Sequence, residues 1–134
     1  MSRTKLCAAG LLGIAVGAFG MHALHAQAPA VKRVPLMKAD LTGTEGKEVV
    51  MTLIEAQPGA EFPAHTHPGD EFLFVIDGSI VTFVEQQRTS LQAGGSFHAP
   101  REKAHGGNIG DKPARLLTVH IVDKGKPFAE RVKK

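Results

Sequence analysis

Three residues near the middle of the chain have side chains that suit a divalent metal ion. His65 and His67 are two positions apart, and side chains two apart in an extended strand point to the same face. Glu71 follows after the short break Pro68-Gly69-Asp70, which can return the chain so that the carboxylate meets both imidazoles. Two neutral imidazoles and one carboxylate are typical ligands of a divalent transition metal with open coordination positions.

A fourth candidate ligand, His105, lies further along the chain in the segment FHAPREKAHGGN. A His-x-His pair alone is more often a surface feature than a ligand pair. Here the pair is accompanied by a glutamate, flanking glycines, a strand-forming run and a distant histidine after a proline, which together favour a metal site. We therefore predict one divalent transition metal per chain, with iron, manganese, nickel, copper and zinc all open as its identity.

The segment around the histidine pair resembles the first motif of the cupin superfamily. The motif's two glycines, two histidines and glutamate are matched at every spacing by Gly59, His65, His67, Glu71 and Gly78. The resemblance extends over roughly residues 49–122.

The segment around His105 resembles the second cupin motif less completely. Gly94, Pro100 and His105 match it, whereas Glu102 stands where a second glycine is expected and Asn108 comes one residue early. These departures leave the shape of the loop before and after His105 open, more than the assignment of His105 as a ligand.

The resemblance implies a fold and a metal-ligand set, but no single reaction. It implies an all-β fold, a small double-stranded β-helix or jelly-roll barrel, with a metal held by three histidines and one glutamate. Cupins include dioxygenases, isomerases, decarboxylases, sugar-binding modules and seed storage proteins, so the fold leaves the chemistry open.

The N-terminus has the pattern of a secretory signal peptide. Arg3 and Lys5 precede an uncharged apolar run, Leu6 to Phe19, which is short for a membrane span and is followed by small residues before Gln27. We expect cleavage before Gln27, a periplasmic or secreted protein, and no membrane contact after cleavage; an uncleaved anchor is the alternative. The predicted divisions are a signal peptide at 1–26, a leader and edge strand at 27–48, the barrel at 49–123 and a charged tail at 124–134.

The composition of the mature chain argues against nucleic-acid binding and against disulfides. The formal charge of the full sequence is +3, and loss of Arg3 and Lys5 with the signal peptide lowers it to +1. Trp and Tyr are absent and no basic stripe is interleaved with aromatic residues, so the sequence has no pattern typical of a nucleic-acid-binding surface. The only cysteine, Cys7, lies in the predicted signal peptide, so no disulfide is expected and the domain must be held by its core and its metal, with or without a partner subunit.

Short apolar and β-branched segments separated by turns predict an all-β barrel or sandwich, because no stretch of the mature chain has a helical apolar repeat. The dipeptide Asp77-Gly78 predicts a hairpin between two of these strands. The expected strands are 31–37 (interrupted by Pro35), 49–56, 62–67, 71–76, 79–85, 89–91, 96–99 and 114–122.

The strand that begins at Glu71 is apolar on both faces. Its inward set is expected to be Glu71, Leu73 and Val75, and its outward set Phe72, Phe74 and Ile76. A strand that faced water would carry polar residues outside. We therefore expect the outer face of this strand to be covered by other residues. A second subunit of a homodimer, which the cupin resemblance favours, or residues 31–37 would cover it.

Several residues near the predicted ligands are weaker candidates. We expect an apolar wall from Phe62, Leu73, Val75 and either Phe97 or Phe83. His98 and His120 are candidate acid–base residues, although a solitary histidine in a strand is more often exposed to solvent or hydrogen-bonded without a functional role. Arg101 and Lys103 could attract an anion, but loop cations are usually only solvated.

These features support a small exported metal-binding protein whose ligand is an oxygen-rich small molecule. The first interpretation is an enzyme, a metal-dependent dioxygenase or isomerase, in which an enediol, hydroxy acid or catechol-like group occupies the open metal positions. The second is a non-catalytic sugar- or acid-binding module, and the third is a metal-buffering or stress protein. Acquisition of the metal in the periplasm would favour copper and zinc.

Overall fold

The computed structural model describes residues 28–133, so the predicted signal peptide lies outside the described residues. This part of the chain contains no helix that is long and apolar enough to cross a membrane. The strands are β1 (Val31–Asp40), β2 (Lys47–Ala56), β3 (Glu61–Thr66), β4 (Gly69–Asp77), β5 (Ser79–Val84), β6 (Gln87–Gln92), β7 (Ser96–Ala99), β8 (His105–Ile109), β9 (Ala114–Asp123) and β10 (Glu130–Arg131).

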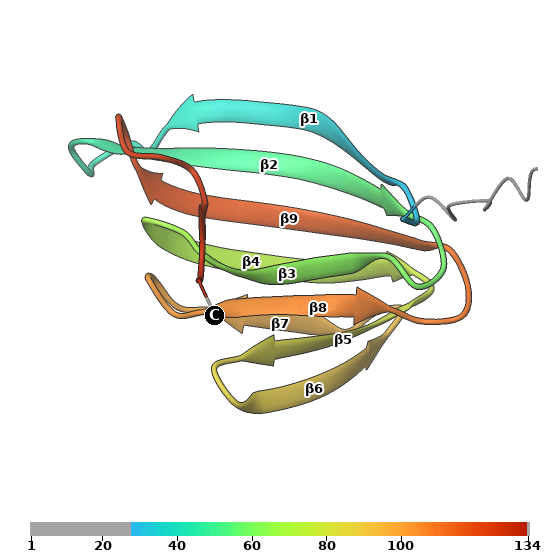
Figure 1. The fold of residues 1–134 in the computed structure, drawn as a ribbon. Coiled ribbons are helices and arrows are strands. Elements are labelled where there is room, and N and C mark those ends of the chain that lie inside the picture. The colour runs from blue at the N-terminus through green and yellow to red at the C-terminus, as the bar shows by residue number, and fades with distance from the viewer. Residues whose placement is uncertain (1–27, 134) are drawn as a thin grey trace, which may run out of the picture.

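The strands form two antiparallel sheets, with the orders β1-β2-β9-β4-β7 and β10-β3-β8-β5-β6 (Figure 1). From β2 onward the chain passes from one sheet to the other at almost every connection, and only β5 and β6 are consecutive in one sheet. This alternation is the double-stranded β-helix that the cupin resemblance implied. It brings segments far apart in sequence side by side, which is how one site collects residues from β3, β4, β8 and β9.

The core lies between the two sheets and follows the two-residue period of the strands. In β9, alternate residues are buried from Ala114 to Val122. Ile54, Val75 and Leu116 from the first sheet form one apolar cluster with Ile80 and Ile109 from the second.

Two strand expectations are corrected by the structure. Asp77-Gly78 does not close a hairpin, because β4 pairs with β7 and β9 whereas β5 pairs with β6 and β8. Gly78, with φ +78°, instead turns the chain from one sheet into the other. The first strand also runs beyond Pro35 to Asp40, because a register shift between Pro35 and Met37 accommodates the proline without ending the strand.

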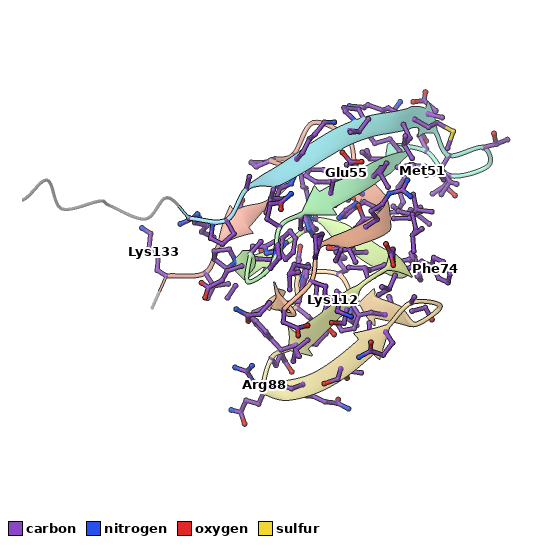
Figure 2. The ribbon with its side chains drawn as sticks, turned by 90° about the vertical axis from the view of Figure 1, so that its right-hand side faces the viewer. Met51, Glu55, Phe74, Arg88, Lys112 and Lys133 are labelled. Carbon is purple, nitrogen blue, oxygen red and sulfur yellow. The ribbon has the colours of Figure 1, made fainter. Side chains whose placement is uncertain are left out.

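The predicted inward and outward faces of β4 are confirmed. Glu71, Leu73 and Val75 are buried, whereas Phe72, Phe74 and Ile76 are 42%, 45% and 38% exposed, and Figure 2 shows Phe74 on the outside of the barrel. The alternative cover by residues 31–37 is wrong, because β1 pairs edge to edge with β2 and does not lie over this face.

Candidate metal centre

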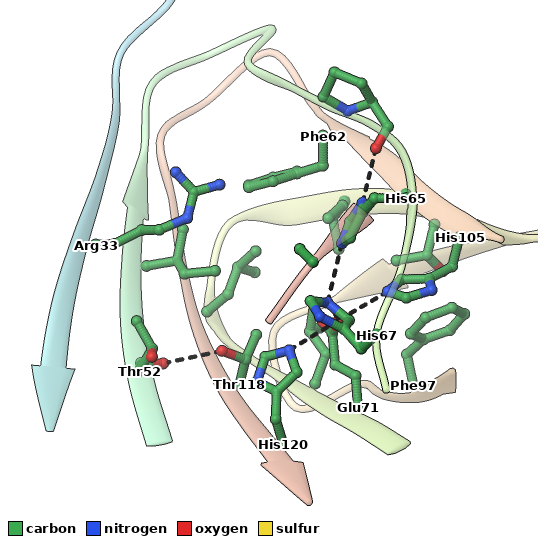
Figure 3. Close-up of a pocket in the computed structure, with 18 of the residues that line it drawn as sticks. Arg33, Thr52, Phe62, His65, His67, Glu71, Phe97, His105, Thr118 and His120 are labelled. Atoms are coloured by element: carbon green, nitrogen blue, oxygen red, sulfur yellow. Dashed lines mark hydrogen bonds and ion pairs between the residues drawn. The ribbon is translucent and has the colours of Figure 1, made fainter. Parts of the chain in front are cut away.

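The four predicted metal ligands meet at one point between the sheets. His65 lies on β3, His67 directly follows β3, and His105 lies opposite His65 on β8. Glu71 comes from β4 in the other sheet. One ligand atom from each residue lies within 4.8 Å of the others, and His67, Glu71 and His105 are buried (Figure 3).

Each of the three histidines is oriented by a hydrogen bond from its Nδ1 atom to the backbone. A carbonyl oxygen only accepts, so Nδ1 carries the proton and Nε2 of the neutral ring keeps its lone pair. The three Nε2 lone pairs therefore face the centre, in the orientation that binding a metal requires, and the backbone carbonyls hold the rings in it. The accepting carbonyls belong to Pro63 (2.8 Å from His65), Phe128 (2.6 Å from His67) and Lys103 (2.8 Å from His105).

The distances within this group require a positive centre. Nε2 of His65 lies 3.1 Å from Nε2 of His67, and Nε2 of His105 lies 2.9 Å from Oε2 of Glu71. In the neutral tautomers each of these contacts joins two acceptors, so a proton or a metal ion must lie between them. Neighbouring ligands that each bind a metal at about 2.1 Å are about 3 Å apart, so the donor set fits a divalent transition metal.

Local interactions give the ligands different affinities for protons. Burial raises the pKa of Glu71, but the imidazole rings of His105, His120 and His67 beside the carboxylate outweigh burial and hold this pKa well below its usual range. Burial lowers the pKa of His105, but the Glu71 carboxylate and the Lys103 carbonyl raise it above its ordinary value. Glu71 is therefore an anion at neutral pH, ready to offset part of a dication's charge.

His120, on β9, contacts the site in a different way. Its Nε2 atom lies 3.2 Å from Oε2 of Glu71, but its Nδ1 atom is buried without a hydrogen-bond partner. The neutral ring can therefore carry its proton on Nε2 and donate it to Glu71. This arrangement makes His120 a residue that positions the carboxylate, and it distinguishes His120 from the three histidines whose Nε2 lone pairs face the centre.

A cavity of about 370 Å³ opens beside the four candidate ligands. Its wall is mainly apolar and also carries the hydroxyl groups of Thr52, Thr82 and Thr118. Of the expected wall residues, Phe62, Leu73 and Phe97 line the cavity. Val75 is fully buried in the core instead.

Comparison with known proteins identifies the fold family. The family model described as "Cupin domain" matches residues 52–120. The chain belongs to the cupin family. No curated protein sequence matches it.

Solved structures with the same fold share little sequence with this cupin. A protein with a double-stranded β-helix domain from Klebsiella pneumoniae is 23% identical, with TM-score 0.62, and the match covers 80% of this chain and 86% of that one. A cupin superfamily protein from Desulfitobacterium hafniense is 19% identical, with TM-score 0.61 and coverage of 75% and 84%. KdgF from Halomonas is 18% identical, with TM-score 0.60 and coverage of 71% and 81%. At these identities the likeness shows the fold alone.

The departure from the second cupin motif at Glu102 has a visible consequence. Glu102 has φ +59°, in the left-handed region that favours glycine. Its amide donates to the His67 carbonyl at 3.1 Å, and the Lys103 amide donates to the Pro100 carbonyl at 3.1 Å. The loop before His105 therefore keeps a turn that suits glycine although a glutamate occupies it.

The remaining candidates from the sequence lie outside the cavity of this cupin. His98 is on the outer face, where its ring stacks on Phe72 with centroids 4.8 Å apart. Arg101 is held by Asp123 at 2.6 Å, and Lys103 by Glu85 at 2.9 Å. These cations are engaged with carboxylates rather than directed at a ligand.

The cavity-lining residues that sequence reasoning missed include Arg33, Phe128 and Arg131. They lie in the segments interpreted as an N-terminal leader with an edge strand and a charged tail. The tail crosses the site because β10 pairs with β3 and the Val132 amide donates to the Ala64 carbonyl at 3.1 Å. For Arg33 a signal existed, since it is two residues from Val31 and so shares a strand face with an apolar residue.

Proposed function

We propose that this chain is an exported metal-dependent cupin enzyme that acts on an oxygen-rich small molecule by oxidation or isomerisation. The observation that carries the proposal is the convergence of three backbone-oriented imidazoles and one ionised carboxylate beside a cavity. A purely structural ion pair would need neither the three oriented rings nor the adjacent space.

The chain's own residues have distinct roles in this proposal. His65, His67, Glu71 and His105 would hold the metal, which supplies a Lewis acid or, if it is iron or copper, an oxygen-activating centre. His120 fixes the Glu71 carboxylate through the 3.2 Å contact. The apolar wall excludes water from the site and so strengthens its electrostatics.

A non-catalytic binding module is the second candidate, favoured by the mainly apolar wall of the cavity. The test uses metal-loaded protein and a panel of enediols, hydroxy acids and catechols, followed by product analysis and oxygen uptake. Turnover that is lost in His105→Ala supports the enzyme. Saturable binding without turnover for every compound supports the binding module.

Export and dimerisation are parts of the same proposal. Intact-mass measurement of protein from the periplasmic fraction tests export, and a chain that begins at Gln27 is expected. A chain that retains residues 1–26 in the membrane fraction would contradict cleavage.

A homodimer through the outer face of the first sheet is supported by a shallow apolar hollow on that face, lined by side chains that include Phe72, Phe74, Leu117 and Val119. Light scattering should give a dimer mass that Phe74→Asp reduces to a monomer mass. Leu36→Asp is the matched control, because Leu36 is 51% exposed but lies on the edge strand β1. A wild-type monomer would contradict the dimer.

A further inference from the structure

Two guanidinium groups line the cavity in addition to the candidate metal ligands. Arg33 reaches it from β1 and Arg131 from β10, strands that belong to different sheets. Glu71 is the only carboxylate among the residues that line this cavity. The cavity therefore combines a metal-binding end with an excess of fixed positive charge.

The register of the first sheet places Arg33 on the inner face of that sheet, where, like Arg131, it remains exposed to solvent. Arg33 pairs with Ile54, which pairs with Leu116, which pairs with Val75. Paired residues of antiparallel strands share a face, and the other three members of this row are buried. The guanidinium carbon of Arg33 lies 5.9 Å from the centre of the Phe62 ring, and Figure 3 shows the guanidinium beside that ring at the cavity.

Arg131 is placed by the register of the second sheet. It pairs with His65, which pairs with His105. Arg131 therefore shares a face with two candidate metal ligands, and all three residues line the cavity.

Neither arginine has a carboxylate partner among residues 28–133, in contrast to the loop cations. Arg101 and Lys103 form ion pairs at 2.6 Å and 2.9 Å. A guanidinium beside an apolar wall is matched best by a carboxylate, which accepts two parallel hydrogen bonds from it.

We infer that the ligand of this cavity carries a carboxylate that Arg33 and Arg131 bind, in addition to the oxygen atoms that bind the metal. This inference rests on the proposed function for the metal-binding end, and it narrows the substrate class from oxygen-rich molecules to organic acids. Neutral enediols and catechols lack the group that the two arginines recognise.

A charge on the inner face of an edge strand can instead protect that edge from pairing with another chain. That explanation suits Arg33 better than Arg131. β10 is also an edge strand, but it is only two residues long and leaves little edge to protect.

The test compares matched acids on the Zn²⁺-loaded protein by isothermal titration calorimetry at fixed ionic strength. The probes are 2-hydroxy dicarboxylates of increasing chain length and the corresponding 2-hydroxy monocarboxylates, which offer the metal the same oxygens. We expect at least one dicarboxylate to bind about tenfold or more tightly than its monocarboxylate partner, because a hydrogen bond between two charged groups is stronger than one between neutral groups.

Arg33→Gln and Arg131→Gln should each remove most of that preference, and Arg33→Lys should retain part of it. Arg115→Gln is the matched control, because Arg115 is an exposed arginine of β9 that does not line the cavity. Equal binding of both acid classes by the wild type, or a preference that survives both glutamine variants, would overturn the inference.

Zn²⁺ content is measured for every variant in parallel. A wild type that loads no metal would contradict the proposed function without deciding the inference. In that case NMR titrations of the metal-free protein with the same acids decide it, with chemical-shift changes at Arg33 and Arg131 expected for the dicarboxylates only. A dicarboxylate that produces no such change would overturn it.

Discussion

Nε2 of His105 lies 2.9 Å from Oε2 of Glu71, and this contact joins β8 of one sheet to β4 of the other. The two residues are separated by 34 positions, so a metal bound between them would link distant parts of the barrel. Because a ligand that binds only the folded state stabilises it, we expect about 2.7 kcal/mol of added stability when free metal is a hundredfold above its dissociation constant.

Thermal melting with and without a chelator measures this linkage. The wild type should melt at a clearly lower temperature after chelation, whereas the melting temperature of His105→Ala should change much less. A wild type whose melting temperature does not respond to chelator or added metal would show that no metal links the two sheets.

Substitution of His120 should change metal affinity without removing a ligand. His120→Ala should keep one metal per chain at saturation but bind it about ten- to a hundredfold more weakly, because the Glu71 carboxylate loses a partner that orients it. His120→Gln should bind more tightly than His120→Ala, since its amide can still donate to Glu71. Competition with a chromogenic chelator gives the affinities, and a His120→Ala protein that binds no metal even at saturation would make His120 a ligand instead.

The strained turn at Glu102 predicts a stabilising substitution. A non-glycine residue in the left-handed region costs about 1 kcal/mol, so Glu102→Gly should be more stable than Glu102→Ala by about that amount. Both variants lose the carboxylate and only the glycine variant loses the Cβ, so their difference isolates the backbone effect. Urea unfolding measures it, and equal stabilities would mean that the positive φ of Glu102 is not strained.

The ion-pair cluster around Asp123 predicts a dependence of stability on pH. The Arg101 guanidinium, with the ammonium groups of Lys47 and Lys126, holds the pKa of the Asp123 carboxyl well below its usual range. The folded state therefore binds this proton less readily than the unfolded chain does. The stabilisation is complete above the ordinary Asp pKa of about 3.9 and is lost as the pH falls below it.

Asp123→Asn removes this contribution, so it should destabilise the protein at neutral pH and lose less further stability on acidification. Unfolding measured from neutral pH down to about pH 3 should show the two proteins converging. Parallel curves at all pH values would contradict the assignment of the ion-pair energy to Asp123.

The all-β class and the inner face of β4 were predictable from local sequence, because strand periodicity is a local property, whereas the barrel followed from the cupin resemblance. The alternation of Glu71, Leu73 and Val75 with Phe72, Phe74 and Ile76 correctly predicted which side chains of β4 are buried. The Asp77-Gly78 hairpin was wrong because a turn signal specifies a change of direction, but not the strand with which the next segment pairs.

The meeting of the four candidate ligands also followed from sequence, because the motif spacing places them. The roles of the two chain ends did not. Arg33, Phe128 and Arg131 reach the cavity through pairings with β2 and β3 that no local pattern encodes. The difference between His98 and His120 likewise depends on which face of which strand each occupies.

Metal content per chain, measured for the wild type and for single alanine variants, tests the four assigned ligands. We expect one divalent metal per wild-type chain, none in His65→Ala or His67→Ala, and strongly weakened binding in His105→Ala. Glu71→Gln should keep the fold with reduced affinity, and His98→Ala should match the wild type because His98 stacks on Phe72 outside the barrel. A wild type without stoichiometric metal, or full metal in His105→Ala together with loss in His98→Ala or His120→Ala, would contradict the assigned ligands.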